Sequence, residues 1–195
     1  MQRPGDRIAR FRTNASTRRV KIQSEPNHRL VVAAGAVGIN IEDNAHAPGQ
    51  PLRIVADQQT RLAAARSASD TVFINARIDT YLANAGGLEE TVTRALAYLE
   101  AGADGVFVPG VVDPATIREL VNAIPAPLNI LVGPGAPTVA ELAGLGVARV
   151  SLGSSIAQSA YAVAQRAAEE IYRKGTYDAV SNALDYGTLN GLLRR

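Results

Sequence analysis

The amino-acid sequence predicts an α/β fold in which strands and helices alternate. Three segments share one design: VVAAGAVGINIED (31–43), YLEAGADGVFVPG (98–110) and ELAGLGVARVSLG (141–153). In each segment we expect a helix to end at a glycine, which suits a left-handed backbone, and a strand to follow closely. The expected strands are continuous apolar runs, which is typical of parallel strands covered on both faces.

Two further apolar runs, TVFINA (71–76) and LNILV (128–132), bring the number of expected strands to five. Successive parallel strands are joined by right-handed crossovers, so the sheet is predicted to be parallel. Two architectures are open at this point: a doubly wound sheet, or part of a (β/α) barrel. A complete barrel needs eight strand–helix units and typically about 250 residues, whereas this chain has 195 residues and five visible units.

The helices between the strands have their own signals. Asp113 followed by Pro114 is typical of a helix start. Thr138 and Glu141 form a capping-box pair at the start of another helix. A long helix is expected over residues 155–174. An apolar stripe predicts a further helix and consists of Leu88, Val92, Ala95 and Leu99.

Composition excludes several classes of function. The chain has no cysteine, which excludes disulfides, thiolate metal sites and a cysteine nucleophile. This fits a reducing compartment, and we expect a cytoplasmic protein. With only His28 and His46, a histidine-built metal site is not expected. No apolar run is long enough to cross a bilayer, and the 5% aromatic content argues against base-stacking platforms for nucleic acid.

The net charge of +2 is unevenly distributed and suggests two regions. Residues 1–30 carry eight Lys/Arg and two Asp/Glu, whereas residues 31–195 carry twelve and sixteen. The folded part is therefore mildly acidic, and nucleic-acid binding by it is not expected. We expect residues 1–30 to be a basic leader. A disordered tail is the favoured interpretation, with a targeting peptide or a start unrelated to the fold as alternatives.

Two adjacent carboxylates, Glu42 and Asp43, follow the first expected strand. In parallel α/β proteins, ligands bind at the carboxyl ends of strands. Acids at this position suit metal or proton chemistry. The structural alternative is that Asp43 caps the next helix or turn and Glu42 pairs with a nearby arginine.

Five motifs occur in one order: AGAVGINIED (34–43), FINARIDTY (73–81), AYLEAGADGVFVPG (97–110), PLNIL (127–131) and ELAGLGVARVSLGSS (141–155). With them, residues 31–195 resemble the isocitrate lyase/phosphoenolpyruvate mutase superfamily, in particular its phosphonomutase-like branch. The resemblance implies a (β/α)₈ TIM barrel whose strands 4–8 are visible here, with strands 1–3 missing or replaced. It also implies a homo-oligomer, a dimer or tetramer, with C-terminal helices exchanged between subunits.

The same resemblance implies Mg²⁺-dependent chemistry on a small 2-oxo or 2-hydroxy acid. Glu42 matches the glutamate that helps hold the hydrated Mg²⁺ ion. Arg77 matches the active-site arginine, which can bind a substrate carboxylate and stabilise a developing enolate. Asp79 matches an acid that orients this arginine. Substrate contacts are further assigned to Asn75 and Asn129, and Asp43 is a supporting residue. The structural alternatives are an Arg77–Asp79 ion pair without a catalytic role and a strand-end cap at Asn129.

Two departures from the family pattern limit these expectations. Residues 1–30 have no counterpart of the acidic motif that supplies the direct Mg²⁺ ligand. The loop NAHAPGQPL (44–52) contains neither the catalytic cysteine of the family's lyases nor the lysine of its mutases. A cysteine-dependent isocitrate-lyase or methylisocitrate-lyase mechanism is therefore excluded.

Three functions stay open. The first is a Mg²⁺-dependent enzyme that decarboxylates or hydrolyses an oxaloacetate-like acid, because aldol-type cleavage would need the missing cysteine. The second is an inactive, truncated family member that acts as an oligomerising fragment, since an incomplete barrel exposes apolar edges. The third is a phosphate-binding barrel that uses the loops at 133–137 and 153–155.

Overall fold

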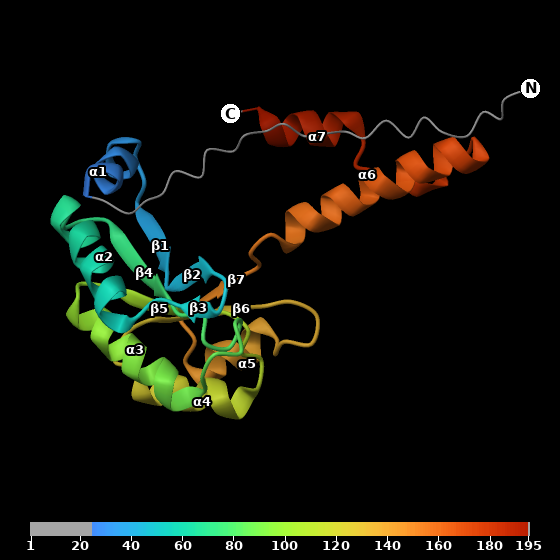
Figure 1. The fold of residues 1–195 in the computed structure, drawn as a ribbon. Coiled ribbons are helices and arrows are strands. Elements are labelled where there is room, and N and C mark those ends of the chain that lie inside the picture. The colour runs from blue at the N-terminus through green and yellow to red at the C-terminus, as the bar shows by residue number, and fades with distance from the viewer. Residues whose placement is uncertain (1–24, 195) are drawn as a thin grey trace, which may run out of the picture.

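The structure is a computed structural model that describes residues 25–194 (Figure 1). A single parallel sheet forms its centre, with the strand order β1-β4-β5-β6-β7. The predicted α/β fold with a parallel sheet is confirmed. The strands are β1 (Gly38–Glu42), β4 (Phe73–Arg77), β5 (Gly105–Val108), β6 (Leu128–Leu131) and β7 (Arg149–Ser151).

Helices cover one face of this sheet (Figure 1). They are α2 (Val55–Ala68), α3 (Leu88–Glu100), α4 (Pro114–Ala123) and α5 (Val139–Leu145), and α1 (Glu25–Ala33) packs on α2. The last elements extend away from the sheet and are α6 (Ser155–Lys174), the 3₁₀-helix η1 (Asp178–Val180) and α7 (Tyr186–Leu193). No helix within residues 25–194 is long and apolar enough to cross a bilayer.

Side chains alternate between the two faces of the sheet, as the pleat of a strand requires. One row faces the helices and builds the core; its paired residues are Ile41, Ala76, Val106 and Leu128, all buried. The next row belongs to the opposite face, which these helices leave uncovered. Its paired residues are Glu42, Arg77, Phe107, Asn129 and Arg149. Pairing in register therefore brings most of the predicted site residues onto one face.

The predicted helix signals are present. Asp113 accepts a hydrogen bond from the Thr116 backbone N–H at 2.8 Å and begins α4. Thr138 and Glu141 make both bonds of the capping box. The long helix α6 has the predicted bounds and ends at a left-handed Gly175.

The structure also corrects several boundaries. Helix α1 begins at Glu25, so the folded part starts before the predicted boundary at Val31, and the rest of the predicted leader lies outside the described residues. The stretch expected to be a loop forms a hairpin of β2 (Asn44–Ala47) and β3 (Gln50–Leu52). Strand β4 ends at Arg77 rather than Ala76, because Arg77 pairs in register with Glu42 and extends both strands.

Candidate active site

Arg77 lies at the centre of the candidate site, at the carboxyl ends of two neighbouring strands. Its Nη1 lies 3.0 Å from Glu42 Oε2 on β1. On its other side, Nε and Nη2 donate to the two carboxylate oxygens of Asp79 at 2.6 and 3.0 Å. This two-point contact fixes the plane of the guanidinium group. The structure thus brings three of the predicted site residues into direct contact.

The guanidinium group of Arg77 lies over Phe107 of β5, with its Cζ 5.8 Å from the ring centroid. A cation at this distance is attracted to the face of an aromatic ring. Arginine has five N–H donors, and the contacts to Glu42 and Asp79 use three of them. The Arg77 side chain is 27% exposed. It can therefore receive a further anion without losing its present partners.

Asp43 is fully buried behind this cluster and supports it. Its Oδ1 accepts the backbone N–H of Asp79 at 2.9 Å, and its Oδ2 accepts from Tyr98 Oη at 3.0 Å and Arg94 Nη1 at 3.1 Å. Burial raises the pKa of the Asp43 carboxyl, although these hydrogen bonds and the charge of Arg94 act in the opposite direction. Asp43 does not cap the next helix, α2; its carboxylate holds the backbone just beyond the end of β4, while Glu42 pairs with Arg77 as the structural alternative expected.

The β2–β3 hairpin brings His46 to the site. His46 Nε2 lies 2.6 Å from Glu42 Oε1, so both carboxylate oxygens of Glu42 have a partner. His46 has a left-handed backbone, with φ 52°, and its N–H donates to Asn44 Oδ1 at 2.8 Å. Asn44 Nδ2 in turn lies 3.4 Å from Asp79 Oδ2. The hairpin therefore contacts both carboxylates that flank Arg77.

The two predicted asparagines lie on the same face as Arg77 but at other positions. Asn75 precedes Arg77 by two residues on β4, is buried, and donates to Asn40 Oδ1 at 2.8 Å. Asn129 lies two strands from Arg77, roughly 10 Å away at the usual strand spacing. Its Oδ1 accepts from Ser151 Oγ at 3.1 Å, whereas its buried Nδ2 has no acceptor among the described residues. Asn129 thus has a hydrogen-bond donor to offer on this face.

The described residues do not fit a directly coordinated Mg²⁺ ion by themselves. Within residues 25–194, no group of three or more His, Asp or Glu side chains is arranged to hold a metal. Both oxygens of Glu42 are engaged by Arg77 and His46. Magnesium prefers oxygen ligands and retains several waters. In this arrangement neither oxygen of Glu42 is left without a partner.

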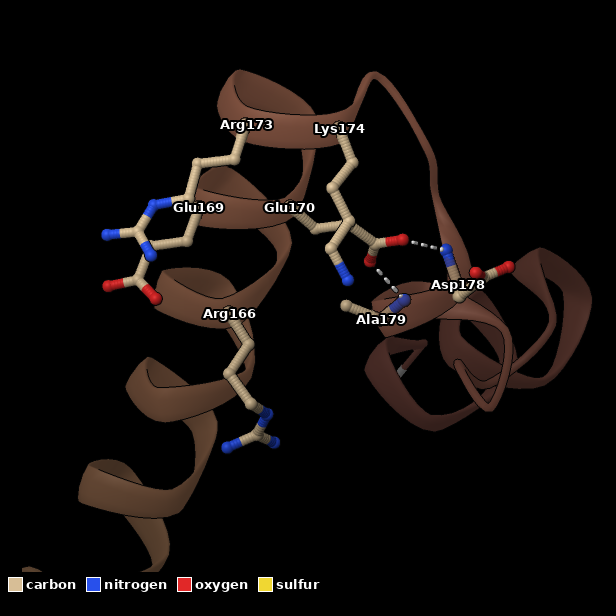
Figure 2. Close-up of a pocket in the computed structure, with 7 residues that line it drawn as sticks. All are labelled: Arg166, Glu169, Glu170, Arg173, Lys174, Asp178 and Ala179. Atoms are coloured by element: carbon tan, nitrogen blue, oxygen red, sulfur yellow. Dashed lines mark hydrogen bonds between the residues drawn. The ribbon is translucent and has the colours of Figure 1, made fainter.

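A hollow of about 510 Å³ lies between α6 and η1, apart from the Arg77 site (Figure 2). The Glu170 carboxylate accepts the backbone N–H groups of Asp178 and Ala179 at 2.9 and 2.7 Å. This contact docks η1 against α6. The hollow contains none of the predicted site residues and is lined by Arg166, Glu169, Glu170, Arg173, Lys174, Asp178 and Ala179. Its charges largely offset one another, so we do not consider it the active site.

The family of the chain follows from its sequence. A family model described as phosphoenolpyruvate phosphomutase matches residues 23–172. The chain belongs to this family. The superfamily resemblance inferred from the five motifs is confirmed, and with it the partial TIM barrel that the resemblance implied.

Curated relatives agree with this family. The chain is 45% identical over 125 residues to the uncharacterized protein Rv1998c of Mycobacterium tuberculosis (strain H37Rv), covering 64% of this chain and 47% of that protein. It is 31% identical over 172 residues to 2-methylisocitrate lyase of Escherichia coli K12, covering 80% of this chain and 56% of that enzyme. The chain thus spans about half the length of these relatives.

Solved structures have the same fold. A Burkholderia cenocepacia J2315 protein, provisionally described as a lyase/mutase, superposes with a TM-score of 0.81 at 34% identity, over 88% of this chain and 64% of that one. A phosphonopyruvate hydrolase in complex with oxalate and Mg²⁺ superposes with a TM-score of 0.70 at 29% identity, over 87% and 64%. Named members of this superfamily act on small carboxylic acids.

Sequence reasoning missed four residues near the site. His46 lies in the stretch taken for a loop, and Phe107 could be placed under Arg77 only once the strand register was known. Arg94 and Tyr98 belong to the buried face of α3 together with Thr91 and Ala95, and of these four residues only Ala95 is in the predicted apolar stripe. The available signal was their spacing of four residues, which places both polar side chains on one face of the helix.

Proposed function

We propose that this chain carries the carboxylate-binding part of a Mg²⁺-dependent lyase- or mutase-type site for a small 2-oxo or 2-hydroxy acid. The observation that supports the proposal most strongly is the placement of Arg77. It lies at the carboxyl ends of parallel strands and is held by Glu42 and Asp79, with one edge open. In (β/α) barrels this end of the strands holds the substrate.

The chemistry that this arrangement suits is the formation of an enolate. When a β-carboxylate leaves as CO₂ from the carbon next to the 2-oxo group, the electron pair of the broken bond stays on that carbon and is delocalised onto the 2-oxo oxygen as an enolate. The free N–H groups of Arg77 can bind the substrate carboxylate and stabilise that charge. Asp79 keeps the guanidinium group in one orientation, so little reorganisation is needed during the reaction. With no thiolate available, decarboxylation or hydrolysis of an oxaloacetate-like acid is favoured over aldol-type cleavage.

Mg²⁺ is part of this proposal, and phosphonopyruvate hydrolase with oxalate and Mg²⁺ is the relative that supports it. In this chain Glu42 would contact a water of the ion, and direct ligands would have to come from outside the described residues. When bound, the ion would supply positive charge to the substrate oxygens. Asn75 and Asn129 are proposed to contribute hydrogen bonds to the acid from the same face.

Turnover measurements on a panel of 2-oxo acids, with and without Mg²⁺, test the proposed function. We expect consumption of at least one acid by the full chain, and its loss on adding EDTA or on replacing Arg77 by glutamine. The matched control is Arg118→Gln, since Arg118 is exposed on α4, away from the site. A folded sample that turns over no acid would contradict the enzyme proposal.

The absence of a complete metal site within the described residues favours a second candidate function, that of an inactive, oligomerising family member. Calorimetric titration with Mg²⁺ distinguishes the two, because only the enzyme is expected to bind the ion. The phosphate-binding alternative and the cytoplasmic location stay predictions.

A homo-oligomer, a dimer or tetramer, is proposed for either function. Helix α6 has no buried residue and exposes Tyr161, Ile171 and Tyr172, and Leu192 and Leu193 of α7 are exposed as well. Large apolar side chains exposed on both of these helices indicate an interaction surface. Light scattering after size-exclusion chromatography is expected to give a mass above 20.5 kDa. A stable monomer at micromolar concentration would contradict this.

A further inference from the structure

We propose that Arg94 and Tyr98 of α3 are positioning residues for Arg77. They act through Asp43, whose carboxylate holds the Asp79 backbone, and Asp79 in turn orients the guanidinium group. This inference rests on the proposed function in so far as Arg77 binds the substrate.

Every link from α3 to Asp79 is a hydrogen bond between buried groups. Tyr98 is fully buried and Arg94 is 8% exposed. Both donate to Asp43 Oδ2, at 3.0 and 3.1 Å, while Asp43 Oδ1 accepts the Asp79 N–H at 2.9 Å. Asp79 is itself fully buried and binds Arg77 at two points. Groups held in this way have little freedom to reorient.

Arg94 also fixes the other side of the site. Its Nη1 lies 2.9 Å from the Arg53 carbonyl oxygen, and the Arg53 N–H donates to the Asp43 carbonyl at 2.7 Å. These two bonds close the base of the β2–β3 hairpin, which carries His46 to Glu42. Arg94 therefore contacts both Asp43, which holds Asp79, and the base of the hairpin that carries His46 to Glu42.

Stability alone is a poor explanation for this arrangement. Replacing a buried ion pair by well-packed apolar residues is often neutral or stabilising. Apolar residues at positions 94 and 98 would make the buried face of α3, which also contains Thr91 and Ala95, more apolar. The polar pair instead makes directional contacts that reach Asp43 across more than fifty positions of the chain. Directional contacts specify geometry, which is what a carboxylate-binding arginine requires.

The variant Tyr98→Phe tests the proposal, because it removes only the hydroxyl group and retains the buried ring. NMR of the ¹⁵N-labelled full chain measures the hydrogen-exchange rate of Arg77 Nε–H, which is bonded to Asp79. We expect exchange to accelerate roughly tenfold, as loss of one hydrogen bond to a charged group predicts. Arg94→Lys keeps the charge but cannot hold Asp43 and Arg53 together, and it should give the same acceleration.

The matched control is Tyr177→Phe, at a residue just before η1 that is 69% exposed, and it should leave the exchange rate unchanged. A second measurement is the dissociation constant of oxalate in the presence of Mg²⁺, which should rise by a similar factor in Tyr98→Phe. If both Tyr98→Phe and Arg94→Lys exchange Arg77 Nε–H within twofold of the wild type, the positioning role is overturned.

The two proposals fail in different ways. A wild-type chain that binds no oxalate contradicts the proposed function, while the exchange rates still decide whether Tyr98 and Arg94 position Arg77. A wild-type chain that binds oxalate, with variants that bind it equally well, contradicts the positioning role alone.

Discussion

Replacing Asp79 by asparagine is expected to lower the free energy of unfolding by about 2–3 kcal/mol. Asp79 accepts two hydrogen bonds from Arg77, at 2.6 and 3.0 Å. In asparagine one of the two accepting oxygens is replaced by an NH₂ group, which would face an N–H donor of Arg77. A hydrogen bond to a charged group contributes about 1.5–3 kcal/mol. The loss stays near one such bond because Arg77 is partly exposed and keeps Glu42 at 3.0 Å. The melting temperature should fall by roughly 5–10 °C.

Urea unfolding followed by circular dichroism measures this change, with Asp70→Asn as the matched control. Asp70 is exposed, so its substitution should stay within about 0.5 kcal/mol of the wild type. If Asp79→Asn unfolds at the same urea concentration as the control, the Asp79–Arg77 contact does not hold the site. If Asp79→Asn is less stable but binds oxalate normally, Asp79 has only a structural role.

Three further substitutions are expected to change stability, all measured by urea unfolding. Burial, and to a lesser extent the charge of Arg61, lowers the pKa of His28 below its ordinary value of 6.5. The protein should therefore keep its stability above pH 6.5 and lose stability below it, as the unfolded chain takes up a proton more readily. His28→Leu should remove this decline, and an unchanged pH profile in that variant would refute the assignment. Arg66→Ala should lower the free energy of unfolding by about 1–3 kcal/mol, because Arg66 donates to three backbone carbonyls and a carboxylate. A loss below about 0.5 kcal/mol, which is usual for a surface substitution, would contradict this. Gly146→Ala should lose about 1–3 kcal/mol, since φ is 96° and the added Cβ would lie 2.8 Å from Val121 Cγ1; a neutral result would mean that α5 can shift freely.

Much of the fold could be predicted because its determinants are local. The cap at Asp113, the capping box at Thr138 and the glycine that ends α6 depend on residues within one helical turn. The parallel strands can likewise be recognised from their own continuous apolar sequences, before it is known which strands they pair with. The site residues at strand ends followed from the same pattern, together with the family resemblance.

The hairpin and the support from α3 could not be predicted because they depend on distant contacts. NAHAPGQPL has weak strand propensity, and it pairs with itself because its ends are tied at Asp43 and Arg53. Arg94 and Tyr98 could be assigned only after the helix had been placed behind Asp43. The same holds for Phe107, whose position under Arg77 follows from strand register rather than from any local motif.

The central claim is that Arg77, held between Glu42 and Asp79, binds a small organic acid. Isothermal titration of the full chain with oxalate in the presence of Mg²⁺ tests it most directly, using the wild type, Arg77→Gln and the control Arg118→Gln. The account predicts binding by the wild type and the control, and affinity weakened at least roughly tenfold in Arg77→Gln, as loss of a charge-assisted contact implies. Equal binding by all three proteins would contradict it.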